Sequence, residues 1–161
     1  MPEILDRLKA AIAEGPGQRS ISERAMDESA HWRAELALLA GDAETAAIRV
    51  GELRDRGAHG LLLARILAAQ GKFGAARAAL QQWEGRMVQA RGTLHGLEME
   101  RASVLVPLGD LEQAIEVLSD GIGRWALPNS TASQGARAHA YPYLAPLYGD
   151  RRFQALIKPR G

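Results

Sequence analysis

Apolar residues along this chain mostly recur three or four positions apart, which is the spacing that places them on one face of an α-helix. Over residues 2–14, for example, Ile4, Leu5, Leu8 and Ile12 share one face. β-Branched residues are few and do not alternate with polar residues over the length of a strand, so we expect no sheet. The pattern therefore predicts an all-α protein.

Glycine and proline separate the helical stretches and indicate where each helix ends. Residues 15–17, Gly-Pro-Gly, end the first helix, and Ser22 is the expected N-cap of the second. The clearest linker is residues 127–134, which contain Pro128. With these boundaries we expect helices over residues 2–14, 22–40, 42–56, 58–70, 74–89, 94–108 and 110–125, and shorter helices over 136–148 and 150–157.

The glycines at three of these boundaries reveal an internal repeat. Gly41, Gly71 and Gly109 lie 30 and 38 residues apart, an average of 34. Each is followed by an apolar residue two positions later, by alanine five positions later and by an aliphatic residue nine positions later. These residues are Ala43, Phe73 and Leu111, then Ala46, Ala76 and Ala114, then Val50, Leu80 and Leu118.

A helix–turn–helix unit explains this spacing. The glycine ends the first helix and forms the tight turn, the apolar residue after it fills the gap between the helices, and the alanine lets the second helix approach closely. The aliphatic residue one turn further on completes the contact. Both spacings differ from their mean by about one helical turn, so the apolar face stays in register.

This pattern resembles the tetratricopeptide repeat of bacterial proteins, a 34-residue unit with glycine at its turn. Residues 59–84 match the family's small, turn, aromatic, small and bulky positions, and residues 98–122 match nearly as well. The first copy is degenerate, because Ala43 stands where an aromatic residue is usual. The matching positions of the two better copies are Ala64, Gly71, Phe73, Ala76 and Leu80, and Ala102, Gly109, Leu111, Ala114 and Leu118.

The resemblance implies an α–α superhelix of about three helix–turn–helix repeats over residues 22–126, with capping helices at both ends. Residues 1–17 would form the N-terminal capping helix, and residues 127–161 a linker and the C-terminal capping helices. The tail, residues 143–157, is similar to the terminal segment of many bacterial repeat proteins. We expect Phe153 and Leu156 to dock against the last layer.

Arrays of this kind generally bind a peptide or another domain on a concave surface, so the resemblance implies a non-enzymatic protein–protein interaction module. By position, the residues that line this groove would be His31, Glu35, Leu61, Arg65, Met99 and Ser103. Members that bind the terminal carboxylate of chaperones use lysine, asparagine and arginine at fixed positions, which here hold His31, Glu35, Leu62, Gly96 and Glu100. We therefore expect a different protein or peptide partner.

Two alternatives to this function stay open. The longer repeat spacing from Leu61 to Leu118 is similar to that of bacterial transcriptional regulators of the maltose-activator type, which implies a regulatory or sensory domain of a larger regulator or signalling protein. The other alternative is self-association, in which two arrays stack through their end faces as a homodimer.

Composition and charge exclude several classes of protein. The chain has no cysteine, which excludes a disulfide scaffold, thiolate metal ligands and a cysteine nucleophile. Its formal net charge of +1 argues against an electrostatically driven nucleic-acid binder. No apolar run is long enough for a transmembrane helix, and the first residues lack the apolar core of a signal peptide. We therefore expect a cytoplasmic protein with no nucleic-acid or membrane partner.

Motifs for catalysis or cofactor binding do not occur. The pairs His31/Glu35 and His95/Glu98 have a spacing that fits one helix face, but a zinc site needs three or four converging ligands and the chain has no HExxH. Phosphate-binding loops and nucleophile elbows are also missing. We therefore expect no catalytic residue, no metal site and no cofactor.

The few large side chains have expected places. We expect Trp32 to lie in the core, Trp83 to pack between repeats and Trp125 to close the last layer. Arg65 has two interpretations, either a solvated side chain on a polar stripe or a groove cation for an acidic ligand. The 29 alanines, about one residue in six, fit close helix–helix approach.

Overall fold

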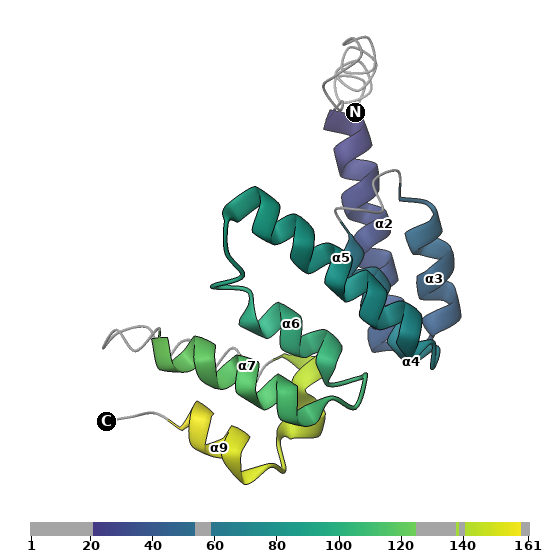
Figure 1. The fold of residues 1–161 in the computed structure, drawn as a ribbon. Helices are drawn as coiled ribbons and strands as arrows, with labels where there is room; N and C mark the ends of the chain where they lie inside the picture. Colours follow the sequence, from purple (N-terminus) through teal and green to yellow (C-terminus); the bar gives the residue numbers. More distant parts are fainter. Residues whose placement is uncertain (1–20, 54–58, 125–137, 139–140, 159–161) are drawn as a thin grey trace. The chain divides into compact units, whose positions relative to one another are not determined.

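Every regular element of the computed structural model is a helix over the residues that it describes, which are 21–53, 59–124, 138 and 141–158 (Figure 1). This confirms the all-α prediction. The chain divides into two compact units, Met1–His59 and Gly60–Gly161. The predicted capping helix at residues 1–17, the linker at 127–134 and Trp125 lie outside the described residues. The helices are α2 (Ile21–Leu39), α3 (Ala43–Gly51), α4 (Gly60–Ala69), α5 (Phe73–Arg91), α6 (Glu98–Leu105), α7 (Leu111–Arg124), the 3₁₀ helix η1 (Pro142–Leu147) and α9 (Arg151–Ile157).

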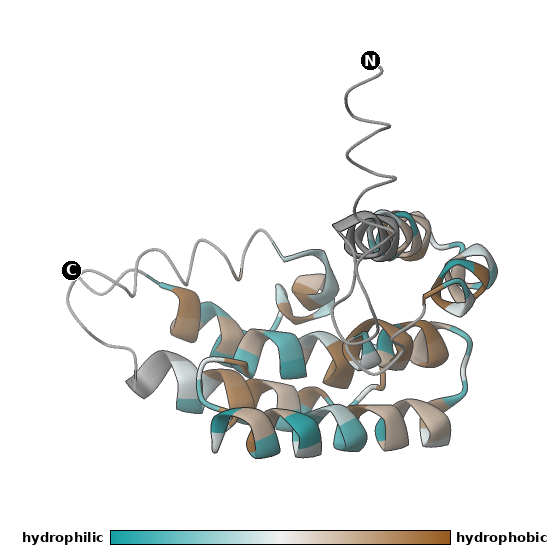
Figure 2. Ribbon diagram, turned by 90° about the horizontal axis from the view of Figure 1, so that it is seen from above, coloured by the Kyte–Doolittle hydropathy of each residue, from teal (hydrophilic) through white to brown (hydrophobic). Residues whose placement is uncertain are grey.

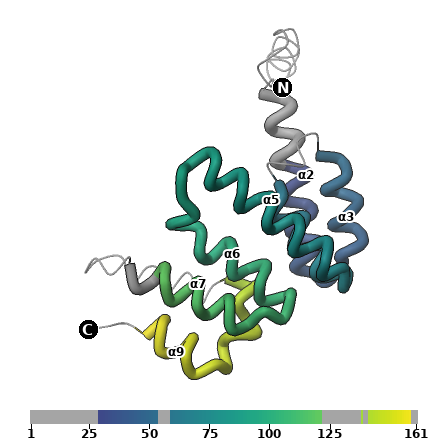
Figure 3. Tube along the Cα trace, viewed as in Figure 1, coloured from purple at the N-terminus to yellow at the C-terminus, as the bar shows by residue number. Residues whose placement is uncertain are grey.

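Consecutive helices pair into three hairpins, which can be followed along the tube in Figure 3. In the first unit α2 packs against α3. In the second unit α4 packs against α5 and α6 against α7, and α4 also lies beside α6. The tail completes the second unit, because η1 contacts α6 and α9 contacts α7. Three helix–turn–helix units therefore exist where the glycine repeat predicts them.

The three repeat glycines form the same turn. Gly41, Gly71 and Gly109 have φ angles of 83°, 72° and 79°, a left-handed conformation that glycine adopts without a steric penalty. In each turn the glycine N–H donates to the carbonyl three residues earlier, at 2.9–3.0 Å. The next residue donates to the carbonyl five residues earlier, at 2.8–3.0 Å. This pair of bonds defines a Schellman motif, which satisfies the last carbonyl groups of the first helix.

The alanines of the repeat lie where the paired helices meet. Ala46, Ala76 and Ala114 have no exposed surface, as close approach of the two helices requires. The aliphatic residues four positions later, Val50, Leu80 and Leu118, are also buried. In Figure 2 hydrophobic segments, in brown, alternate with hydrophilic segments, in teal, along the helices.

The residue that follows each glycine by two positions does not fill the gap between the helices, and this prediction is wrong. Phe73 is 45% exposed and Leu111 is 38% exposed, and Ala43 is only partly buried. Each of these residues begins the second helix of its hairpin, next to the turn and outside the length over which the alanine and the aliphatic residue are buried.

The largest differences from the predicted helices are at α6, at α3 and at residues 142–147. Helix α6 begins at Glu98 rather than 94, because Gly92 and Gly96 have φ angles of 73° and 83°, which a helix interior does not adopt. Helix α3 ends at Gly51, five residues early. Residues 142–147 form a 3₁₀ helix instead of an α-helix, since in an α-helix the ring of Pro146 would clash with the carbonyl four residues earlier.

The core of the second unit joins α4, α5, α6 and α7 to the tail. Phe153 has no exposed surface and Leu156 packs against the same cluster, so the expected docking of the tail is confirmed. Trp83 is buried, and a Cβ at Gly60 would lie 3.4 Å from the Trp83 Cβ, a contact within one hairpin, whereas its packing between repeats stays a prediction. The start of α4 therefore passes directly against the tryptophan of its own hairpin partner, α5.

The N-terminus of α9 is held by Asp150. Its carboxylate accepts from the backbone N–H groups of Arg152 and Phe153, at 2.7 and 3.4 Å, and so caps the helix. The Arg152 guanidinium donates both to Asp150 and to Glu112 of α7, in each case at 2.9 Å or less. This arrangement connects the cap of α9 to α7.

Replacement of Gly121 by alanine is expected to destabilise the protein by about 1–3 kcal/mol. A Cβ at this buried position in α7 would lie 2.6–2.9 Å from side-chain atoms of Glu98, including the Glu98 Cβ. The matched control is Gly85→Ala in α5, where a Cβ meets nothing within 4 Å. The control is expected to stabilise the helix by about 0.5–1 kcal/mol. Thermal unfolding of both variants measures the difference, and equal shifts would contradict the close approach of α7 to Glu98.

Acid is expected to weaken the docking of α9. The hydrogen bonds from the Arg152 guanidinium, followed by the backbone N–H of Arg152, lower the pKa of Asp150 from 3.8 to about 2. Because the pKa is depressed in the folded state, this contribution to stability is present above pH 3.8 and is lost as the pH falls towards 2. Carboxyl ¹³C NMR titration measures the pKa directly. Asp150→Asn, which keeps a capping oxygen, should remove this part of the pH dependence, and a midpoint near 3.8 would contradict the capped ion pair.

Candidate interaction surfaces

The six predicted groove residues fall on three helices. His31 and Glu35 lie on α2 in the first unit. Leu61 and Arg65 lie on α4, and Met99 and Ser103 on α6, in the second unit. Because α4 and α6 pack side by side, the four residues of the second unit share one region of it.

Arg65 is buried, at 5% exposure, so its interpretation as a solvated side chain is wrong. Its Nε donates to Ser103 Oγ at 2.9 Å, and a terminal nitrogen donates to the Tyr141 hydroxyl at 3.1 Å. The guanidinium carbon lies 4.4 Å from the centroid of the Tyr143 ring, within cation–π distance. The charged group is thus enclosed between α6 and the segment that leads into η1.

The other three residues of this region are covered as well. Ser103 has no exposed surface, and its hydroxyl donates to the Glu100 carbonyl at 2.6 Å. Leu61 and Met99 are partly buried and pack against the core of the unit. The structure therefore brings Arg65 and Ser103 into contact, as one shared surface requires, but the chain's own tail lies over them.

Tyr141 and Tyr143 were not among the predicted site residues. The available signal was the sequence Tyr-Pro-Tyr, which contains two of the three tyrosines of the chain. Nothing local indicates that this segment reaches Arg65, which lies 76 residues earlier than Tyr141. Their role depends on a long-range contact that no periodic pattern encodes.

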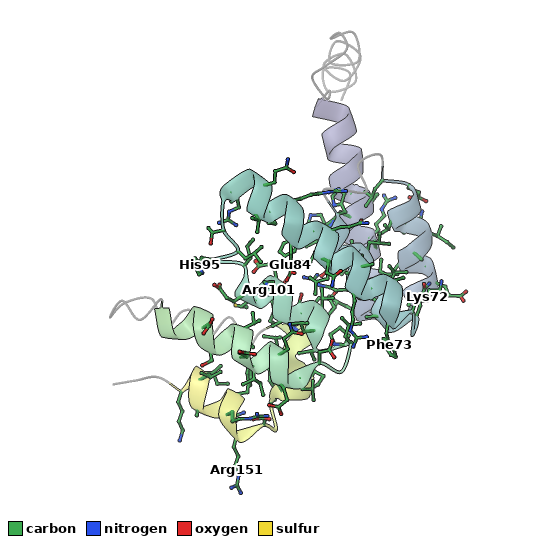
Figure 4. All side chains as sticks on the ribbon, in the orientation of Figure 1. Lys72, Phe73, Glu84, His95, Arg101 and Arg151 are labelled. Carbon is green, nitrogen blue, oxygen red and sulfur yellow. The ribbon has the colours of Figure 1, made fainter. Side chains whose placement is uncertain are left out.

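Two ion pairs connect the hairpins of the second unit. Arg101 of α6 donates to Glu84 of α5 at 2.7 Å, and Figure 4 shows these side chains pointing toward each other. Arg77 of α5 binds both carboxylate oxygens of Asp110, which precedes α7, at 2.9–3.1 Å. A bidentate arginine–carboxylate pair fixes orientation as well as distance.

In the first unit, His31 lies against two aromatic side chains. Its Nδ1 is 3.0 Å from Nδ1 of His59, so one ring donates a proton to the other. Its ring also meets Trp32 edge-on, with centroids 5.5 Å apart. Among the described residues, no group of three or more histidine, aspartate and glutamate side chains is arranged to hold a metal ion.

Large apolar side chains are exposed along one side of α2. Trp32 is 62% exposed, Leu36 65% and Leu39 47%, so the prediction that Trp32 lies in the core is wrong. The opposite side of the helix carries Ala34 and Leu38, which are buried. Helix α2 has apolar residues on both sides. The side that carries Ala34 is the buried one, because a small residue lets the neighbouring helix approach closely. We call Trp32, Leu36 and Leu39 the α2 stripe.

Comparisons with protein-family models, with curated proteins and with solved structures found no match to this chain. The resemblance to tetratricopeptide repeats therefore stays a prediction from the sequence. Of the helices that the structure describes, none combines the length and the apolar character needed to span a membrane.

Proposed function

We propose that this protein is a non-enzymatic interaction module of the tetratricopeptide type, which binds an amphipathic helix of a protein partner on the α2 stripe. The observation that carries the proposal is the exposure of Trp32, Leu36 and Leu39 on one side of one helix. A cytoplasmic location belongs to the same proposal, and its support is a sequence without cysteine.

The spacing of the stripe favours a helical partner. Trp32, Leu36 and Leu39 are four and three residues apart, so they form a continuous ridge along the helix axis. A ridge of this kind packs between the side chains of a second helix. Tryptophan is also among the residues that contribute most to binding when a partner covers them.

The size of the stripe favours a short segment over a second copy of the chain. With about 150–250 Å² for a whole aromatic side chain, the exposed parts of these three residues amount to a few hundred Å². Stable dimers bury about 800 Å² on each partner. A patch of a few hundred Å² is instead typical of a local functional site on a monomer.

The absence of catalytic motifs supports a binding role. The sequence carries no nucleophile elbow, phosphate-binding loop or zinc-protease motif. In the second unit, the polar cluster around Arg65 and Ser103 is covered by tyrosines. An interaction module needs only a stable scaffold and an exposed complementary surface.

Site-specific photo-cross-linking in the cell of origin is expected to test the proposal. A benzophenone amino acid at position 32 should cross-link one protein, whereas the same group at position 86, an exposed position of α5, should not. The identified partner is then purified and its affinity measured. Trp32→Ala and Leu36→Ala should each weaken binding by about 30-fold or more, the loss expected of a central anchor.

The matched control is Val88→Ala on α5, an apolar residue of similar exposure to Leu39. This variant should bind the partner as the unchanged protein does. Equal cross-linking from positions 32 and 86, or a product containing only this chain, would contradict a heterologous partner on the α2 stripe. Unchanged affinity of the Trp32 variant would do the same.

A further inference from the structure

We propose that the surface formed by Arg65 and Ser103 is a binding subsite for a tyrosine–x–tyrosine peptide segment, and that the chain's own Tyr141-Pro142-Tyr143 occupies it. This subsite lies in the second unit, apart from the α2 stripe, and does not depend on the function proposed for that stripe. The predicted groove residues of α4 and α6 would then bind a peptide, and the tail would be their ligand in cis.

The contacts of Arg65 divide between scaffold and ligand. One nitrogen is fixed by Ser103 of α6, at 2.9 Å. Two further contacts go to one short segment, the Tyr141 hydroxyl at 3.1 Å and the face of the Tyr143 ring at 4.4 Å. A guanidinium is suited to this task, since its planar group donates hydrogen bonds at its edge and stacks on an aromatic ring with its face.

A buried cation is an unexpected choice for packing alone. Transfer of a charged group out of water is costly, and well-packed apolar residues of similar volume often stabilise a core at least as well. Charged groups in such places contribute to specificity in several proteins, because only a matching partner satisfies them. Arg65 at 5% exposure, satisfied in part by two tyrosines, fits that role.

The two tyrosines are separable from the residues that anchor the tail. Leu144 and Leu147 are buried in the core at 0–1% exposure, as is Phe153. Tyr141 and Tyr143 are only partly buried. Replacing the two rings should therefore empty the subsite while the anchors keep the tail in place.

Attachment to the scaffold gives the tail an advantage over an external peptide. A ligand on a short tether has an effective concentration in the millimolar range. A tripeptide in solution therefore competes with the tethered tyrosines and should bind more tightly once they are removed.

The experiment compares the full chain with Tyr141→Ala/Tyr143→Ala, using N-acetyl-Tyr-Pro-Tyr-amide as the probe. Binding is followed through the NMR signal of the Arg65 Nε–H group. The unchanged chain should bind the probe several-fold more weakly, because the tethered tyrosines compete with it, and the double variant should bind with a Kd in the millimolar range or tighter. Adding Arg65→Met to the double variant should abolish binding, and a Leu-Pro-Leu peptide should bind neither protein.

Failure of the double variant to bind at about 10 mM peptide, several times the expected effective concentration, would overturn the proposal. Binding that persists without Arg65 would also overturn it. Far-UV circular dichroism and thermal unfolding check that the double variant stays folded.

A second measurement applies even where the double variant unfolds. In the unchanged chain, the Tyr143 ring should shift the Arg65 side-chain proton signals upfield, and Tyr143→Leu should remove that shift. The matched control is Tyr143→Phe, which keeps an aromatic ring 4.4 Å from the Arg65 guanidinium and should therefore keep the shift. Arg65 signals that do not respond to Tyr143→Leu, or that respond equally to both variants, would contradict recognition of Tyr143 by Arg65.

Discussion

The hairpins depend on one steric condition, which is that the second helix of each carries nothing larger than a methyl group where it crosses the first. Ala46, Ala76 and Ala114 meet this condition with no exposed surface. A larger side chain there would force the helices apart and cost about 1–3 kcal/mol. The glycine turn before each alanine makes this close approach possible. Its positive φ directs the chain back along the helix that has just ended.

This local condition explains why so much of the fold could be predicted from the sequence. A glycine with positive φ and an alanine five residues later are both recognisable without knowledge of the rest of the chain, as are the buried Val50, Leu80 and Leu118. The start of α9 also follows from a local signal, the capping Asp150. Periodicity over a few turns contains enough information for such elements.

The errors arise where burial depends on what another segment covers. The apolar pattern alone does not show that Phe73 and Leu111, next to their turns, lie outside the buried length of their hairpins. It also assigns an α-helix to residues 142–147, where Pro146 leaves a 3₁₀ helix that positions Tyr143 over Arg65. Packing of this kind is decided by contacts between distant parts of the chain, which no short window contains.

The predictions for Trp32 and Arg65 are wrong in opposite directions with respect to burial. A sequence-based expectation places tryptophan inside and arginine outside, because burial favours apolar surface and penalises charge. Here Trp32 is 62% exposed and Arg65 is 5% exposed. Burial of the Arg65 charge requires compensating contacts, and these come from Ser103 and the two tyrosines, which belong to distant parts of the chain. Trp32 meets the half-buried His31 edge-on and keeps most of its surface exposed beside Leu36 and Leu39, because the closely packed side of α2 is the one that carries Ala34.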